Sequence, residues 1–489
     1  MQKIAHPPSL DLEGGDENES HYLGSGVFSG LTLREISANS GTSSGTNFQF
    51  RQVSFDPRQP AYFVKSKSFM YGRGPTTGKT AFEAVCRESV VAGSDIPTKA
   101  LSILQRTVLP ALPFINATRL ETACLGVGDC GPIPYALLAG IIAHSSPYIT
   151  EMRAIHKTVW SHALLALEDE YRQPRLQTLQ LALLAFSARP IYTENAGQSD
   201  IGLARAIGAA HLLGLHMEPS NWDLPLWEKS VRKRIWWTLL IHDKWRAVMY
   251  GRPSNLHRLY HNVVLPTVTD GDWGKYASPA VQLSLETFVA TCRLTLIIEL
   301  MVETMGELSD WQNSIVVRSA VGSCMRTVNF VLALSGADRE SFWMPYSSLH
   351  ISNSACLLVR IAIQSKSTDA DLVAESIRSV ILVTEGLLSM YQESAWDVAE
   401  SALKWMTAIL SAACHQLPEL KESARAVARA LDIPMNSDDI SVEEAFSSSD
   451  LNFDPMAWLG NDVSWLSADI FNGIPGPESS IEGMQAPMF

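Results

Sequence analysis

Paired cysteines are absent from this 489-residue sequence. Its seven cysteines stand at positions 86, 124, 130, 292, 324, 356 and 414, an odd count without a CxxC pair. Disulfide frameworks and zinc knuckles both need paired spacings, so neither is indicated. Cys292, Cys324, Cys356 and Cys414 stand in apolar, helix-like surroundings, and we interpret them as small buried hydrophobic side chains.

Long apolar runs are also missing. No stretch of about 18 uncharged apolar residues, the length that crosses a bilayer, occurs in the chain. The N-terminal stretch MQKIAHPPSLDLEGGDENES lacks the apolar centre of a signal peptide. We therefore expect neither a membrane protein nor a secreted one.

Positive charge is in deficit, because 38 Lys and Arg face 51 Asp and Glu, a formal net charge of −13. Such a chain holds nucleic acid only through a local basic patch. The basic run Arg232-Lys233-Arg234 spreads over roughly 200° of a helix surface, so we expect it to border a buried apolar stripe and not to form a patch. Residues 437–489 hold ten acids and no Lys or Arg, which leaves a net charge of −3 on the first 436 residues.

Composition divides the chain into three parts. Residues 1–80 are rich in Gly, Ser, Asn and Asp, and we expect a poorly ordered arm that docks locally through islands such as Tyr22-Leu23 and Val27-Phe28. Residues 81–431 show long apolar-periodic stretches without alternation of period two, which predicts an all-α, multi-helix domain. Residues 432–489 form an acidic tail that we expect to be disordered.

Two segments show helical periodicity best. In residues 201–217 the apolar positions recur at helical spacing, and Asp200 is placed to cap the helix start. In residues 226–250 one apolar stripe runs from Trp227 to Met249. On its solvent side Glu228 and Arg232 are expected to pair, and Gly251 is expected to end the helix.

Catalytic and cofactor patterns occur only in unsuitable surroundings. The GxGxxG match at residues 126–131 follows a mixed segment instead of a strand and precedes two prolines, which favours an interhelical loop. The GxSxG match at residues 41–45 lies in low-complexity sequence, and residues 72–80 miss the phosphate-loop spacing. His211 and His216 are five residues apart, and His242 is interpreted as a core histidine. We expect no enzyme and no cofactor.

Residues 204–253 resemble the fungal-specific transcription factor domain, the middle homology region of zinc-binuclear-cluster regulators. The similarity covers roughly residues 97 to 365, and Val108-Leu109-Pro110 and the apolar helix at residues 134–144 are similar to its earlier pieces. Residues 220–222 and the GRPSN exit are similar to regulators and co-activators of nitrogen-source utilisation. The signature positions are Leu213, Gly214, Leu215, His216, Arg234, Trp236, Trp237, Asp243, Gly251, Arg252 and Pro253.

The resemblance implies an all-α regulatory body in a nuclear transcription factor, without catalytic activity. The family carries six cysteines in CxxC-containing groups that bind zinc beside a basic DNA-reading segment, and this sequence has no such groups. Either a zinc cluster precedes Met1 in the complete protein, or the chain reaches promoters through a DNA-binding partner, as a homodimer or a heterodimer. We expect recruitment through a DNA-binding partner. Zinc would be bound only if a zinc cluster precedes Met1.

The tail indicates a transcriptional role independently. Acidic residues surround a set of aromatic and leucine side chains, keep them solvated and leave them able to dock into a partner's groove as a short induced helix. A helical ligand-sensing or scaffold protein, with a pocket lined by Trp236, Trp237 and Trp245, is the alternative. The predicted activation residues are Phe446, Phe453, Trp458, Leu459, Trp465 and Phe471.

Overall fold

The structure is a computed structural model of the whole chain, and it describes residues 7–10, 18–23, 48–56, 61–67, 77–88, 96–124, 133–188, 196–268, 279–305 and 314–433. The chain forms two compact units, Met1–Met406 and Thr407–Phe489, which are considered separately. The predicted activation segment lies outside the described residues, as do the Val27-Phe28 island and the GxGxxG and GxSxG matches.

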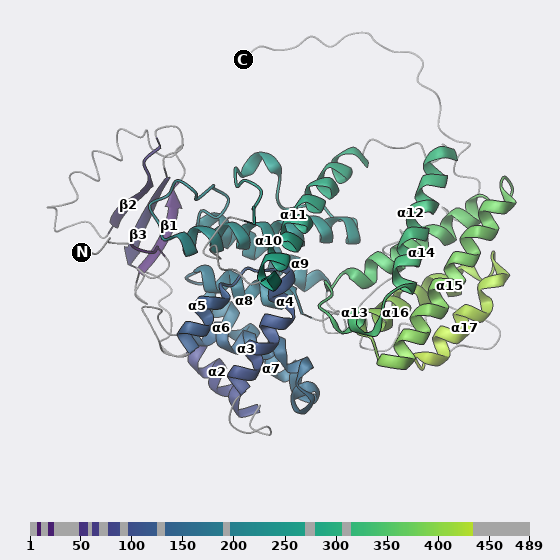
Figure 1. Ribbon diagram of the computed structural model, residues 1–489, viewed down its shortest axis with the longest axis horizontal. Helices are drawn as coiled ribbons and strands as arrows, with labels where there is room; N and C mark the ends of the chain where they lie inside the picture. Colours follow the sequence, from purple (N-terminus) through teal and green to yellow (C-terminus); the bar gives the residue numbers. More distant parts are fainter. Residues whose placement is uncertain are drawn as a thin grey trace, which may run out of the picture. The chain divides into compact units, whose positions relative to one another are not determined.

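Helices make up most of the described chain, which confirms the all-α fold class (Figure 1). Short 3-10 turns occur at η2 (Ser146–Tyr148), η3 (Thr150–Ile155), η5 (Arg258–Tyr260) and η6 (Pro418–Leu420). The helices are α2 (Thr77–Glu88), α3 (Ile96–Arg106), α4 (Val108–Ala111), α5 (Ala117–Cys124), α6 (Tyr135–Ser145), α7 (His156–Glu170), α8 (Leu176–Phe186), α9 (Ala196–Leu212), α10 (Leu226–Tyr250), α11 (Pro279–Met305), α12 (Ser314–Leu332), α13 (Gly336–Glu340), α14 (Ser347–Gln364), α15 (Ala370–Ser394), α16 (Asp397–Ala413) and α17 (Lys421–Ala430).

A small sheet lies within the segment that the sequence assigns to a poorly ordered arm. Strands β1 (Asn18–Leu23), β2 (Phe48–Ser54) and β3 (Ala61–Lys67) form an antiparallel sheet in the order β1-β3-β2, visible at one end of Figure 1. Tyr22 lies opposite Phe63 in the register, and their rings meet edge to face. The Tyr22-Leu23 island therefore belongs to a strand, which the sequence analysis did not predict.

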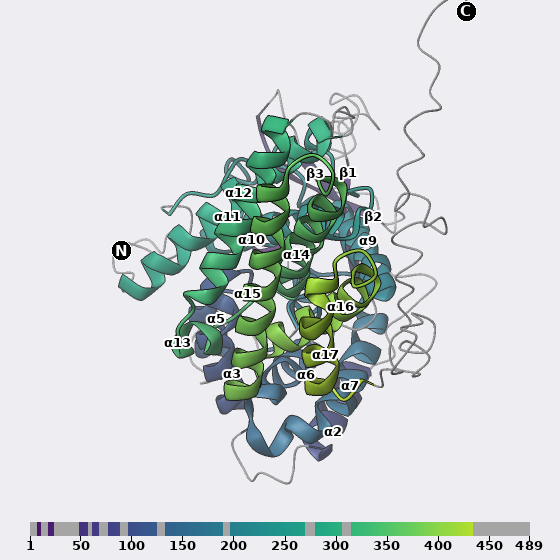
Figure 2. The same cartoon turned by 90° about the vertical axis from the view of Figure 1, so that its right-hand side faces the viewer.

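The main core of the first unit surrounds α6. This helix is apolar on nearly every face, as expected of a helix buried on all sides, and it packs against α2, α3, α7 and α8. Farther along the chain, α12, α14 and α15 pack against one another, and Figure 2 shows them side by side. Of the four cysteines interpreted as buried, Cys292, Cys324 and Cys414 are buried and Cys356 is partly exposed.

Helix α10 has the bounds that the sequence predicts. Pro225 precedes its first turn, and Gly251 ends it in the left-handed conformation, with φ of 62°. A residue without a Cβ adopts this conformation at little cost, which explains the stop. The preceding helix begins earlier than predicted, at Ala196, so Asp200 lies inside α9 and is not its cap.

Gly140 provides a test of the packing around α6. A Cβ at this position would overlap Cδ1 of Leu181, whose side chain is itself buried. We expect Gly140→Ala to lower the free energy of unfolding by about 1–3 kcal/mol through overpacking. The measurement is urea unfolding followed by circular dichroism.

Gly208 of α9 is the matched control, because a Cβ there would meet no described atom within 4 Å. Gly208→Ala should raise the free energy of unfolding by about 0.5–1 kcal/mol through helix propensity alone. Equal effects of the two substitutions would contradict the packing described for α6.

Candidate functional site

The signature residues meet around α10, where a set of charged side chains is buried. Leu213 and Leu215 are buried at the turn that follows α9. Gly214 has φ of 70°, and a Cβ on it would lie 3.0 Å from the ring of Tyr22 in β1. His216 contacts the same tyrosine ring edge to face, with centroids 5.1 Å apart. The turn that precedes α10 therefore packs against strand β1 of the small sheet.

The first buried ion pair lies at the beginning of α10. Arg232 donates to Glu228 Oε1 from Nε at 2.9 Å and from Nη2 at 2.8 Å, and from Nη1 to the Leu213 carbonyl oxygen at 2.9 Å. Glu228 Oε2 accepts from Ser9 Oγ at 2.6 Å and from the Leu10 backbone N–H at 3.0 Å. The pairing itself was predicted correctly, but the solvent-side location was wrong, since the two side chains are 0% and 3% exposed.

A second ion pair, formed by a buried lysine and a partly exposed glutamate, follows one residue later. Lys233 Nζ lies 3.3 Å from Glu218 Oε1. Glu218 Oε2 also accepts from the Val264 backbone N–H at 2.9 Å, and the Glu218 N–H donates to Asn262 Oδ1 at 2.7 Å. One carboxylate thus connects α10 to the chain on both of its sides.

The basic run of α10 is not a surface patch. Arg232, Lys233 and Arg234 are all buried, which confirms the prediction that they border the apolar stripe. A phosphate backbone cannot reach side chains that the fold covers, so this run does not supply a nucleic-acid contact.

The C-terminal half of α10 fixes the exit loop. Asp243 accepts from Ser254 Oγ at 2.5 Å, from the Asn255 N–H at 2.9 Å and side-chain amide at 3.0 Å, and from the Leu256 N–H at 3.0 Å. Ser254 and Asn255 of the GRPSN exit therefore donate hydrogen bonds to the buried carboxylate of Asp243. This is the structural role of the exit motif.

Three further basic residues complete the network, two in this half of the helix and one in the loop that follows it. Lys244 Nζ lies 2.8 Å from Glu299 Oε1 of α11 and donates to Ser254 Oγ at 2.8 Å. Arg246 Nε donates to Asp200 Oδ1 at 2.7 Å, and Arg252 pairs with the other oxygen of Asp200. Asp200 therefore binds two arginines from α10 and its exit.

Neighbouring tryptophans fill the core beside these charges. Trp236 and Trp237 are buried, and Trp237 Nε1 donates to the Val264 carbonyl oxygen at 3.0 Å. Trp245 stacks on Tyr346, with centroids 5.7 Å apart. Each of the three rings packs against other side chains, which favours a structural role for them; the suggested ligand pocket stays a prediction.

Histidines surround the ring of Trp236. The centroid distances to His261, His211 and His216 are 5.4, 5.7 and 6.3 Å. Burial, followed by the charges of His211 and His261, lowers the pKa of His216 to about 4, so the His216 ring is neutral at physiological pH. Burial also lowers the pKa of His211 and that of His261. Among the described residues, no group of three or more His, Cys, Asp or Glu side chains is arranged to hold a metal ion.

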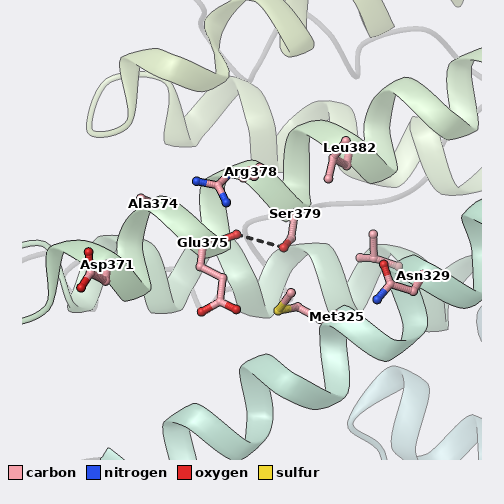
Figure 3. A pocket seen from close by; sticks show the side chains of 9 residues that line it. Met325, Asn329, Asp371, Ala374, Glu375, Arg378, Ser379 and Leu382 are labelled. Carbon is pink, nitrogen blue, oxygen red and sulfur yellow. Dashed lines mark hydrogen bonds between the residues drawn. The ribbon is translucent and has the colours of Figure 1, made fainter.

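A groove of about 340 Å³ lies elsewhere, between α12 and α15 (Figure 3). Ser379 Oγ donates to the Glu375 carbonyl oxygen at 2.9 Å and is thereby satisfied within its own helix. Figure 3 shows charged side chains along α15 facing the uncharged side chains of α12. The lining residues are Met325, Val328, Asn329, Asp371, Ala374, Glu375, Arg378, Ser379 and Leu382.

The sequence analysis did not predict the acidic partners of the basic residues in α10. Glu218, Glu299 and the double role of Asp200 were not predicted. One signal was available for Glu299, which stands alone in the apolar run LTLIIEL, since an isolated acid there indicates a buried cation. Asp200 and Glu218 carry no comparable local signal.

The part of the chain that resembles known proteins contains the helix α10 and its charged partners. Residues 137–337 match the family described as a fungal specific transcription factor domain, which confirms the resemblance over that range. This stretch includes all of α10 and the acidic partners of its buried basic residues, Asp200, Glu218 and Glu299. No solved structure matches the chain.

The curated relatives are regulators of transcription. An uncharacterised transcriptional regulatory protein of Schizosaccharomyces pombe is 36% identical over 101 residues, 21% of this chain and 15% of that protein. The transcriptional activator protein DAL81 of Saccharomyces cerevisiae is 36% identical over 95 residues, 19% of this chain and 9% of that protein. Cutinase transcription factor 1 beta of Fusarium vanettenii is 24% identical over 201 residues, 37% of this chain and 22% of that protein. The chain thus spans less than a quarter of the length of these relatives.

The Glu228–Arg232 pair gives a mutational test of the site. Arg232→Ala would leave a buried carboxylate without its countercharge, and we expect the free energy of unfolding to fall by about 3–5 kcal/mol. Glu228→Gln/Arg232→Met, which removes both charges, should be less destabilised. Urea unfolding of the variants measures both effects.

The exposed pair formed by Arg429 and Glu422, 71% and 74% exposed and 2.7 Å apart, is the control. Arg429→Ala should change the free energy of unfolding by less than about 1 kcal/mol. A loss as large as that of Arg232→Ala would mean that burial does not explain the effect.

Buried histidines predict an acid-dependent loss of stability. Burial lowers the pKa of His144 to about 4, and burial together with the charge of Arg246 lowers that of His242 to about 3. The unfolded chain, with a histidine pKa near 6.5, binds these protons first as the pH falls. Their contribution is therefore complete above pH 6.5 and decreases below it, by up to about 1.4 kcal/mol per pH unit for each histidine.

Unfolding free energies measured between about pH 7 and about pH 5 check this dependence. His144→Leu removes one of the two groups and should give a shallower fall with pH, whatever its effect at neutral pH. An unchanged slope would show that His144 does not titrate on unfolding.

Proposed function

We propose that this chain is a nuclear regulator of fungal transcription. It acts through protein contacts of its helical domain and of its acidic C-terminal segment. The observation that supports this most is the family match at residues 137–337, which contains α10 and the ionic partners of its buried basic residues. The relatives, which are named as transcriptional regulators, support the same function.

The helical domain is proposed to regulate and not to catalyse. Two of its carboxylates hold loops in place: the signature residue Asp243 holds the exit loop, and Glu218 holds the chain near Val264. A catalytic carboxylate needs access to a substrate, whereas Asp243 is buried and both carboxylates are engaged by hydrogen-bond donors of the chain. The family and the named relatives are regulators of transcription, which supports a non-enzymatic role.

Contact with DNA is proposed to be indirect. The basic run of α10 is buried, the net charge is −13, and the sequence has no CxxC pair that could carry the family's zinc cluster. A DNA-binding partner would then bring the chain to promoters. The similarity of the GRPSN exit to regulators of nitrogen-source utilisation stays a prediction about the pathway.

The acidic segment is proposed to recruit the transcription machinery. Within residues 437–489, aromatic side chains alternate with acids and no Lys or Arg interrupts them. Trp458 and Leu459 are large apolar side chains of the kind that a short induced helix inserts into an apolar groove. Solvated acids keep such side chains available for docking.

A reporter assay tests the segment. Residues 437–489 fused to a heterologous DNA-binding domain should activate a reporter, and Trp458→Ala/Leu459→Ala should reduce activation by about tenfold, because anchor residues carry most of the energy of such interfaces. Ser464→Ala in the same fusion is the matched control and should leave activation unchanged.

Three results would each contradict one part of the proposal. Fusions that stay silent at expression levels matched to an active control would remove the activation role. A full-length fluorescent fusion excluded from the nucleus would remove nuclear regulation itself. Promoter occupancy that persists when the DNA-binding partner is deleted would contradict the indirect contact alone.

A further inference from the structure

Helix α11 carries an apolar stripe that the rest of the described chain leaves open to solvent. Leu283 is 64% exposed, Leu294 44% and Ile297 56%, and Thr287 and Ala290 between them are exposed as well. Solvent faces of helices are normally charged, yet only Glu286 and Arg293 carry charge on this face. Contiguous apolar surface of this kind indicates an interaction site.

The opposite face of α11 is fixed in the body of the first unit. Phe288 and Cys292 lie in the main core, and Ser284 Oγ donates to the Pro110 carbonyl oxygen at 2.7 Å. Trp245 Nε1 donates to Thr295 Oγ1 at 3.2 Å, and Glu299 pairs with Lys244. Because these contacts hold the opposite face of α11, the helix cannot rotate to bury the apolar stripe.

A membrane is a poor fit for this helix. Among the described residues, Val281–Glu299 is long and apolar enough to cross a bilayer by length and composition, and 28% of it is buried. Crossing would require the Glu299–Lys244 pair to break and Phe288 to leave the core. One such helix is also what the core of a soluble protein provides.

The spacing of the stripe matches a helix–helix seam. Leu283, Thr287, Ala290, Leu294 and Ile297 follow one another at intervals of four, three, four and three residues. Alternation of three and four is the heptad spacing by which one helix packs along another. From the first to the last of these positions the stripe is about 21 Å long, at 1.5 Å per residue.

The positions of Glu286 and Arg293 indicate which helix would pack along the stripe. Glu286 and Arg293 each precede a seam residue by one position, so both lie on the same flank of the stripe. In an antiparallel pair of identical helices, equal flanks face each other, and Glu286 of one copy meets Arg293 of the other twice around the two-fold axis. In a parallel pair the facing flank carries only Ser284, Thr291 and Ile298, which hold no charge.

We propose that α11 is a self-association surface, at which the α11 helices of two copies pack antiparallel along this stripe. The interface is self-complementary, because each copy provides one acid and one base to the same seam. Four or five apolar side chains per copy place it among small interfaces, which associate reversibly. The proposal does not depend on what the protein regulates.

Sedimentation equilibrium of the full-length chain over a micromolar concentration range tests it. The wild type should show a monomer–dimer equilibrium, and Leu294→Asp should raise the dissociation constant at least about tenfold, since both copies lose a buried leucine. Leu165→Asp, a substitution of a leucine 63% exposed on α7, is the matched control and should leave the equilibrium unchanged.

Charge exchange tests the antiparallel geometry. Glu286→Arg and Arg293→Glu should each weaken the dimer, and Glu286→Arg/Arg293→Glu should restore it, because both pairs re-form with reversed signs. Thermal unfolding confirms that each variant is folded.

Three outcomes would overturn the proposal. The first is a wild type that stays monomeric across the range. The second is a dimer that Leu294→Asp does not weaken, or that the double charge exchange does not restore. The third is a monomer that binds phosphatidylcholine vesicles through Leu294, which would assign the stripe to a membrane surface.

Discussion

The burial of charge inside α10 is the constraint on which the rest of this structure depends. Taking a carboxylate or guanidinium out of water costs several kcal/mol unless a partner of opposite charge and further hydrogen bonds meet it. Glu228 pairs with Arg232 and accepts further hydrogen bonds from Ser9 and Leu10. Asp243 accepts hydrogen bonds from the loop after Gly251. These hydrogen bonds hold the segments that supply the donors against α10, although those segments have no regular structure.

How far the sequence predicts this arrangement depends on the range of each interaction. The bounds of α10 follow from Pro225 and Gly251, which act through the local backbone, and the prediction was correct. The Glu228–Arg232 pair also follows from i,i+4 spacing. That spacing identifies two neighbours on a helix but contains no information on what covers them. The assignment to the solvent side was therefore wrong.

Non-local contacts account for what the sequence analysis missed. Asp200 fits a cap by its position before an apolar run, yet its partners Arg246 and Arg252 lie about fifty residues farther along. The strands are short, and each becomes stable only by pairing with the others and by packing Phe63 on Trp222. Composition indicated disorder for this region because such distant pairings leave no periodic trace in a short segment.

The hydrogen bonds between Ser9, Leu10 and Glu228 affect how a fragment of this protein should be designed. They join positions 218 or more residues apart, and the stretch that matches the family begins at residue 137. A fragment cut to the family match would keep the acid and the arginine but remove two donors from a side chain that water does not reach. The unit of homology is thus smaller than the unit of folding, and expression boundaries should include Ser9 and Leu10, which precede the first strand.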